Sequence, residues 1–313
     1  MIENAKVAVV GVGNNTSALV QGINFYRSTG SLVGIHQPQL NGLGVENIDF
    51  VVAFALSEGK VGKDLHQAIF APPNNFPRLD AELPPSGVVV RDGLTDSTGI
   101  RRVAEALEGA EVLLYSAPSG RPDIARAYAE AALLAGVAFV NTTADPIARD
   151  FSLLKRFEEA GLPLIGDDLA SQFGSSVVHK TLLRLLEERG LTLVSSYQVN
   201  LGGTEDFRNL AENPASKKQS KMNALGSEKV QLAPLGYLPH LKSQKIAHLN
   251  IEAQGWAETA VSLDIRLQVH DPSGAAGVNI DLIRVAATAL RSGRGGYPAE
   301  AAAHLKSPPG TSA

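Results

Sequence analysis

The sequence predicts an α/β fold in which a parallel sheet covered by helices precedes a smaller α+β region. Short apolar segments alternate with helical segments through residues 5–190, which is typical of parallel strands joined by right-handed crossovers. A glycine-containing turn at 11–13 follows the first apolar segment. Beyond the lysine-containing segment 216–221, residues 247–251 and 260–269 alternate apolar and polar residues, which indicates half-buried antiparallel strands.

Each expected element has its own pattern. Aliphatic and β-branched residues predict short buried strands at 6–10, 50–56, 88–91, 112–116, 137–141 and 162–165. Helical periodicity lies between or after them at 16–27, 100–107, 122–135, 151–160 and 177–189. Strands are expected at 192–200, 247–251 and 260–269, and a last helix at 278–290. We therefore expect a first domain at 1–195, an α+β domain at 196–274, and a C-terminal part, 275–313, that packs back on the first domain.

Composition excludes several classes of function. The chain has 313 residues, a formal net charge of −4 and no long basic run, so nucleic-acid binding is not expected. The absence of cysteine excludes thiol catalysis, disulfides and cysteine-ligated metals. No apolar stretch approaches membrane-spanning length, and the N-terminus lacks the layout of a signal peptide. We expect a cytoplasmic protein that binds no membrane.

The first strand, Gly11-Val12-Gly13 and the following helix form the start of a dinucleotide-binding turn. Its glycines let the backbone approach a pyrophosphate, and the helix N-terminus supplies N–H donors. Thr16 occupies the place of the usual third glycine, so a plain strand–helix turn is the alternative. Ala55 replaces the acid expected where the second strand ends, and Ser57 or Glu58 could substitute for it. No arginine nearby selects a 2′-phosphate, which favours NAD over NADP.

Polar residues follow other predicted strands at their carboxyl ends, where ligands bind in parallel sheets. These residues are Ser116 with Pro118, Asn141, and Asp167 with Asp168. The two aspartates could hold a nicotinamide ribose, help bind a cation or cap a helix.

Lys217 and Lys221 lie four residues apart, on one face if the segment is helical. Such a pair suits the binding of a phosphate, enolate or carbonyl oxygen together with proton transfer. A solvated basic surface is the alternative. His179 and His304 fit no metal-ligand spacing.

Six colinear segments resemble one family, the myo-inositol-phosphate synthases, particularly their short prokaryotic form. The segments are 9–17 (VVGVGNNTS), 166–174 (GDDLASQFG), 200–207 (NLGGTEDF), 216–221 (SKKQSK), 270–281 (HDPS leading to GVNID) and 305–309 (LKSPP). The resemblance implies a Rossmann NAD domain, an α+β domain for catalysis and tetramerisation, and a homotetramer. Relatives use a divalent or a monovalent cation, and the metal ligands of this chain stay unassigned.

The resemblance also implies a reaction without net oxidation or reduction. Tightly bound NAD oxidises C5 of a hexose 6-phosphate, C6 then attacks a carbonyl carbon, and the NADH formed reduces C5 again. Deprotonation beside a ketone develops an enolate oxygen, which a nearby ammonium stabilises. The product is a cyclitol phosphate, and NAD is regenerated in each turnover.

Site residues are carried over by motif. The expected catalytic residues are Lys217, Lys221, Lys306, Asp206 and Asp271. The expected substrate-binding residues are Thr204, Ser216, Ser220, Asn250 and Asn200. The expected cofactor-binding residues are Gly11, Gly13, Asn14, Asn15, Ser57, Ser116, Pro118, Asn141, Asp167, Asp168 and Ser171. Without the resemblance, Asp206 could cap a helix, Asp271-Pro272-Ser273-Gly274 could be an ordinary turn, and Lys306 could lie in a disordered tail.

Four positions depart from the family pattern. Thr204 replaces an asparagine, Asn250 a lysine or arginine, Ala170 a lysine, and Ala55 an aspartate. This pattern suggests retained chemistry on an altered substrate. Glucose 6-phosphate would give inositol 1-phosphate, whereas fructose 6-phosphate would give a five-membered cyclitol phosphate, as in family variants of carbocyclic-nucleoside biosynthesis. The sequence favours neither sugar. The alternatives are an NAD-dependent polyol-phosphate dehydrogenase and a non-catalytic NAD-binding regulator.

Overall fold

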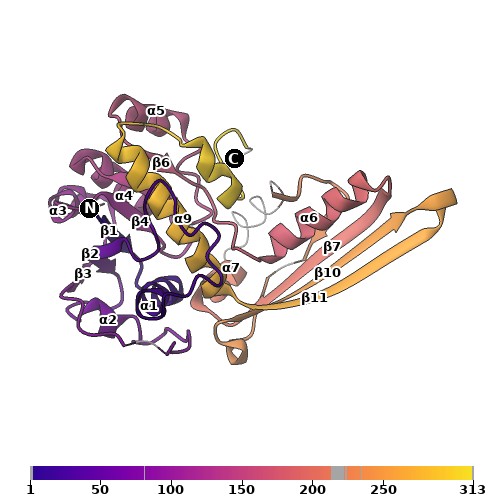
Figure 1. Ribbon diagram of the computed structural model, residues 1–313, viewed down its shortest axis with the longest axis horizontal. Coiled ribbons are helices and arrows are strands. Elements are labelled where there is room, and N and C mark those ends of the chain that lie inside the picture. The colour runs from indigo at the N-terminus through magenta and orange to yellow at the C-terminus, as the bar shows by residue number, and fades with distance from the viewer. Residues whose placement is uncertain (1–2, 81, 213–221, 223, 234, 312–313) are drawn as a thin grey trace.

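A computed structural model describes residues 3–80, 82–212, 222, 224–233 and 235–311 (Figure 1). Six parallel strands form one sheet in the order β3-β2-β1-β4-β5-β6. They are β1 (Ala5–Val10), β2 (Ile48–Ala55), β3 (Val90–Asp92), β4 (Val112–Tyr115), β5 (Ala138–Asn141) and β6 (Leu164–Ile165). The predicted parallel sheet is confirmed. Its strand order reverses between β1 and β4, the place where such sheets bind ligands.

Helices cover both faces of this sheet. Val7 and Val9 of β1 belong to one buried cluster with helix α1, whereas Ala8 and Val10 belong to the opposite cluster. This split arises because successive side chains of a strand point to opposite faces. The helices of this region are α1 (Asn14–Thr29), α2 (Leu65–Ala68), α3 (Ile100–Ala106), α4 (Pro122–Ala135) and α5 (Phe151–Glu159). Helix α2 was not predicted, because four residues are too few to show a helical period.

The last long helix, α9 (Asp271–Arg291), returns to the first sheet and packs beside α1 (Figure 1). It begins at Asp271 rather than at the predicted Val278. The interpretation of 271–274 as an ordinary turn is therefore wrong. Small residues fill the extra turns and hide their period, and Pro272 suits a first helical turn because its missing N–H would lack a partner there anyway.

A second sheet extends away from the first (Figure 1) and has the order β11-β10-β7-β8, with β9 also paired to β7. Its strands are β7 (Thr192–Gly202), β8 (Val230–Leu232), β9 (Gly236–Tyr237), β10 (Gln244–Gln254) and β11 (Ala260–His270). The predicted antiparallel arrangement is confirmed for β10 and β11. The predicted strand at 192–200 is β7, which pairs antiparallel with β10 and in parallel with β8 and β9. Helix α6 (Ser175–Glu188) packs against β7 and β10, and α7 (Glu205–Glu212) follows β7.

The C-terminal segment pairs with the chain that follows β6. Ala170 N–H donates to His304 O at 2.9 Å, and Lys306 N–H donates to Asp168 O at 2.7 Å. Lys306 is therefore held in place, and the alternative of a disordered tail is wrong for this residue. Four short 3-10 helices complete the described secondary structure: η1 (Ser97–Gly99), η2 (Pro239–Leu241), η3 (Trp256–Glu258) and η4 (Ala299–His304). No described helix is both long enough and apolar enough to span a membrane. The domain boundaries stay a prediction.

Candidate active site

A cavity of about 390 Å³ lies beyond the carboxyl ends of the parallel strands. One part of its wall is the phosphate turn, residues 10–15, with the ends of β2 and β4. Another part comes from the segment 168–177, the start of α7 and the start of α9, with one residue each from β10 and the C-terminal segment. The cavity thus joins the switch point of the first sheet to the base of the second.

The phosphate turn is built for close backbone approach. Gly11 has φ +93°, and a Cβ there would lie 2.5 Å from Ser116 O, so only glycine fits. Gly13 is the N-cap of α1. The first two residues of that helix, Asn14 and Asn15, line the cavity, so the amides of the helix N-terminus lie at the cavity wall. Thr16 donates a hydrogen bond to Gly11 O at 2.5 Å. Its hydroxyl thereby braces the turn, which explains why this position need not be glycine.

Lys60 is a residue that the sequence did not reveal. It is 4% exposed and lines the cavity, and its Nζ donates to Val12 O at 2.6 Å and to Asn74 Oδ1 at 2.7 Å. Burial lowers the pKa of Lys60 to about 8. In the sequence, Lys60 lies in a loop with glycine and glutamate and looks like an ordinary surface lysine. Its distance of five residues from the end of β2 was the one sequence signal that it could line the cavity.

The remaining groups near the turn fit a dinucleotide. Ser116 Oγ is buried and has no hydrogen-bond partner among the described residues, so it can bond to a ligand. Ser57, Pro118 and Ser171 also line the cavity, whereas Glu58 does not. Glycines that admit a pyrophosphate, helix amides and an unpaired hydroxyl are together the polar groups that NAD requires.

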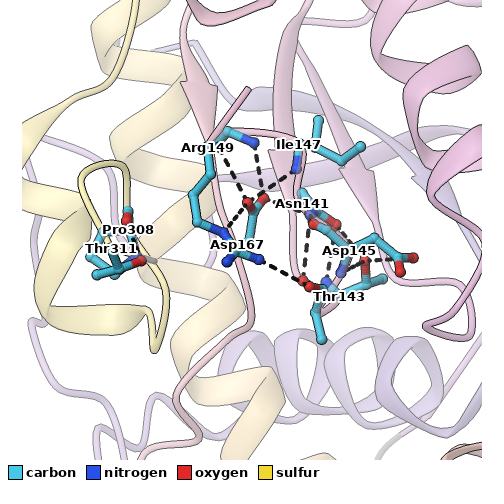
Figure 2. Close-up of polar contacts among 10 residues, drawn as sticks. Asn141, Thr143, Asp145, Ile147, Arg149, Asp167, Pro308 and Thr311 are labelled. Carbon is cyan, nitrogen blue, oxygen red and sulfur yellow. Dashed lines mark hydrogen bonds and ion pairs between the residues drawn. The ribbon is translucent and has the colours of Figure 1, made fainter. Parts of the chain in front are cut away.

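Asn141 and Asp167 are absent from the described cavity lining and belong to a network of polar contacts (Figure 2). Both are fully buried, and Asn141 Nδ2 donates to Asp167 Oδ1 at 2.7 Å. The same carboxylate accepts hydrogen bonds from the backbone N–H groups of Ile147 and Ala148. It also forms an ion pair with Arg149, whose Nε lies 3.1 Å from Oδ2. This network holds the chain between β5 and β6 in place. The structure does not bring these two residues to the predicted cofactor surface.

Asp168 and Lys306 form an ion pair in the cavity wall. Lys306 Nζ lies 2.8 Å from Asp168 Oδ1 and donates to Leu169 O at 2.7 Å. Asp168 is 1% exposed and adopts φ +54°. The backbone pairing between the C-terminal segment and 167–170 therefore carries a lysine from the end of the chain into the site.

A second pair, Lys245 and Asp271, lies in the same cavity with Nζ 3.1 Å from Oδ1. The sequence predicted Asp271 but missed Lys245. In the sheet, Lys245 pairs with Gly202 across β10 and β7, so its side chain is near the Gly-Gly turn. A Cβ on Gly203 would lie 2.4 Å from Lys242 N, which explains why a bulkier residue does not fit here. Strand register, which spacing along the chain does not disclose, brings Lys245 into the site.

Asp206 and Thr204 also line the cavity. The N–H of Phe207 donates to Thr204 Oγ1 at 3.4 Å, so Thr204 contributes to the start of α7. Asp206 lies in the first turn of that helix. Of the four departures from the family pattern, Thr204, Ala170 and Ala55 face this cavity.

The other predicted residues fall elsewhere. Asn250 is absent from the described cavity lining, and its Nδ2 donates to Glu252 Oε1 and Asp264 Oδ1 within the second sheet. Asn200 is 1% exposed and accepts from Ser175 Oγ, a cavity residue, at 2.7 Å. Lys217, Lys221, Ser216 and Ser220 lie outside the described residues.

Comparisons with known proteins point to one family. A family model described as myo-inositol-1-phosphate synthase matches residues 174–272. The inositol-3-phosphate synthase of Mycolicibacterium smegmatis is 37% identical, covering 97% of this chain and 93% of its own length. That of Mycobacterium tuberculosis is 36% identical, covering 97% and 91%.

Two solved structures extend the similarity. Ari2 superimposes with a TM-score of 0.90 at 52% identity, covering 99% of this chain and 94% of its own. A myo-inositol-1-phosphate synthase-related protein from Thermotoga maritima shares the fold, with a TM-score of 0.78 at 22% identity and coverages of 98% and 93%. The likeness therefore extends over nearly the whole chain, including both sheets.

Proposed function

The chain belongs to the inositol-phosphate synthase family of NAD-dependent sugar-phosphate cyclases, and we propose on that basis that it cyclises a hexose 6-phosphate in the cavity described above. The observation that carries the proposal is the continuity of this cavity. It runs from the phosphate turn to two lysine–aspartate pairs, Lys306 with Asp168 and Lys245 with Asp271. A sugar phosphate beside a bound dinucleotide would meet both pairs.

The residues divide the work of binding and chemistry. Gly11, Gly13 and the first amides of α1 hold the pyrophosphate, and Ser116 Oγ supplies a further hydrogen bond. Bound NAD would supply the acceptor, and later the donor, of the hydride at C5. The ammonium groups of Lys306 and Lys245 stabilise negative charge on the substrate, either the enolate oxygen or the phosphate. Asp168 and Asp271 fix the directions of these ammonium groups.

Proton removal from C6 needs a further group. Lys217 and Lys221 remain our proposed candidates, because a lysine beside another cation has a lowered pKa, which favours proton transfer. In the proposed cycle the base takes the C6 proton, the carbon attacks the carbonyl carbon, and an ammonium donates a proton to the new alkoxide. Oxidation at C5 also releases the proton of the C5 hydroxyl, and an equivalent proton returns to that oxygen when the ketone is reduced. Atoms therefore balance without a co-reactant other than the regenerated NAD.

The substrate is either glucose 6-phosphate or fructose 6-phosphate. Three altered positions, Thr204, Ala170 and Ala55, face the cavity, which supports a changed ligand surface. The identity to Ari2, 52%, exceeds that to the two mycobacterial inositol-3-phosphate synthases, at 37% and 36%. Membership of the family does not by itself identify which of the two sugar phosphates is the substrate.

The test is to incubate the protein with NAD and each hexose phosphate and to identify the product by NMR. We expect a cyclitol phosphate from at least one sugar and no accumulation of NADH. The ring size then assigns the substrate. NADH that accumulates with turnover would instead favour a polyol-phosphate dehydrogenase, and no cyclic product from either sugar would overturn both versions.

We also propose a homotetramer that forms through the second sheet. Large apolar side chains are exposed there, namely Val194, Tyr197, Val261 and Leu263. Exposed apolar surface of this kind marks interaction sites. Light scattering should give about four times the chain mass of 32.9 kDa, and a mass of one chain would contradict the proposal. A cytoplasmic location stays a prediction.

A further inference from the structure

Three potential metal ligands meet outside the cavity. His36 comes from the loop after α1, Asp281 from the middle of α9, and His304 from the end of η4. Their ligand atoms all lie within 4.8 Å of one another. None of the three belongs to the described cavity lining, so this cluster is separate from the candidate active site.

The geometry is close to that of a three-ligand site. His36 Nδ1 lies 3.2 Å from Asp281 Oδ2, and the rings of His36 and His304 are 5.7 Å apart at an angle of 77°. Ligand atoms around a tetrahedral zinc ion, with bonds of about 2.0–2.1 Å, are separated by about 3.3 Å. The histidine–aspartate pair already has this spacing, and a small movement of the exposed His36 side chain would complete it.

The surroundings suit a site with three protein ligands and one position open to water, rather than a site closed by four protein ligands. Asp281 is buried, with 2% of its side chain exposed, whereas the His36 side chain is 56% exposed and leaves a path for an ion and for water. Arg284 is fully buried and pairs with Asp281 Oδ1, while Asp281 Oδ2 faces His36. Arg284 thus orients the carboxylate, as outer-shell partners of metal ligands do, and its charge limits the affinity.

We propose that His36, Asp281 and His304 bind one Zn²⁺ or a similar borderline divalent ion, with water at the open position. The ion would tie three distant segments together. His304 precedes Lys306 by two residues, and its carbonyl accepts the N–H of Ala170 in the cavity wall. The segment that contains His36 also contacts the chain after β6, because Gln172 Nε2 donates to the carbonyl of Gly34, two residues before His36. Metal binding would therefore stabilise the placement of the segment that carries Lys306.

The test uses the full chain after treatment with a chelator. Equilibrium dialysis against micromolar Zn²⁺, without NAD or sugar, should give one ion per chain. His36→Ala and His304→Ala should each weaken binding at least tenfold, while His240→Ala, which removes an exposed histidine elsewhere, should leave it unchanged. At a hundredfold excess of Zn²⁺ over the dissociation constant, the melting temperature should rise by about 5 °C. Hydrogen exchange in 299–311 should slow.

Two results would overturn the proposal: less than one ion per chain, or wild-type affinity in either histidine variant. Far-UV circular dichroism of the metal-free variants reports whether each one folds. If His304→Ala does not fold, His36→Ala decides alone, because His36 is exposed and its replacement leaves the core intact.

Discussion

The polar groups at the two ends of the cavity differ in whether they are paired with a carboxylate. At the phosphate-turn end, the Ser116 hydroxyl has no partner among the described residues, and Lys60 is buried against carbonyl and amide oxygens without a carboxylate in those contacts. At the other end, Lys306 and Lys245 each meet an aspartate. The first end is thus prepared to receive an anion, whereas the second holds ammonium groups in fixed directions. We therefore propose that the first end binds the cofactor and that the second stabilises charge during the reaction.

Replacing Lys306 should have the largest effect. Lys306→Ala removes the ammonium beside Asp168, and we expect cyclisation to slow by about 10²–10⁴-fold. NAD affinity should change little, because the phosphate turn is untouched. Single-turnover kinetics and NAD titration measure the two effects. Lys155→Ala, at an exposed lysine of α5, is the matched control. Near-normal turnover in Lys306→Ala would remove this lysine from the site.

Replacing Gly11 tests the other end. In Gly11→Ala, the methyl group would lie 2.5 Å from Ser116 O in a backbone conformation with positive φ. We expect NAD binding to weaken more than tenfold and the free energy of unfolding to fall by about 1–3 kcal/mol. Calorimetric titration and denaturant unfolding measure these changes. The control is Gly22→Ala in α1, where a Cβ has open space and which is absent from the described cavity lining. Equal NAD affinity in wild type and Gly11→Ala would contradict the close approach.

Breaking the Lys245–Asp271 pair should slow cyclisation by about 10–10²-fold. Lys245→Met removes the ammonium, and Asp271→Asn removes the carboxylate that orients it. Lys245→Met and Asp271→Asn should show losses that do not add in the double variant, since the two groups act together. The measurement is kcat/KM for the sugar phosphate. Additive losses would show that the two residues act independently.

Lys60 provides a test by pH. Its pKa of about 8 means that the ammonium is present below pH 8 and is lost above it. A bound pyrophosphate favours the charged form, so NAD affinity should be constant at lower pH and fall as the pH rises through about 8, by about fivefold. Lys60→Met should bind NAD more weakly at pH 7 and show no such fall. An identical pH profile in both proteins would exclude Lys60 from cofactor binding.

Thr204→Asn should give the smallest effect. It restores the residue typical of the family at a cavity position. One hydrogen bond is worth about 0.5–1.5 kcal/mol, so the ratio of kcat/KM for glucose 6-phosphate to that for fructose 6-phosphate should change by about 2–10-fold. Asn250→Lys, which changes a position away from the described cavity lining, serves as a comparison. An unchanged ratio in Thr204→Asn would show that this residue does not select the sugar.

The sequence predicted the parts of the fold that depend on local patterns. Buried strands, capped helices and the Gly11 turn each leave a signal within a few neighbouring residues, and their order then implies the parallel sheet. The start of α9 was missed because Gly274, Ala275, Ala276 and Gly277 carry little periodicity.

The site was predicted less completely, because contacts across the fold bring its members together. Lys245 enters through strand register, and Lys60 through burial under the phosphate turn. Asn141 and Asp167 do lie at strand ends, yet they turn inward to bond each other. His304 fits no ligand spacing because its partners are 23 and 268 residues away along the chain (304 − 281 and 304 − 36).

The central claim is that hydride leaves C5 and returns to it within one cavity. It can be tested with a hexose 6-phosphate that carries deuterium at C5, a catalytic amount of NAD, and NMR of the product. We predict a cyclitol phosphate that retains deuterium at the former C5, with no net NADH. Deuterium that accumulates in reduced cofactor, with no ring formed, would contradict the claim.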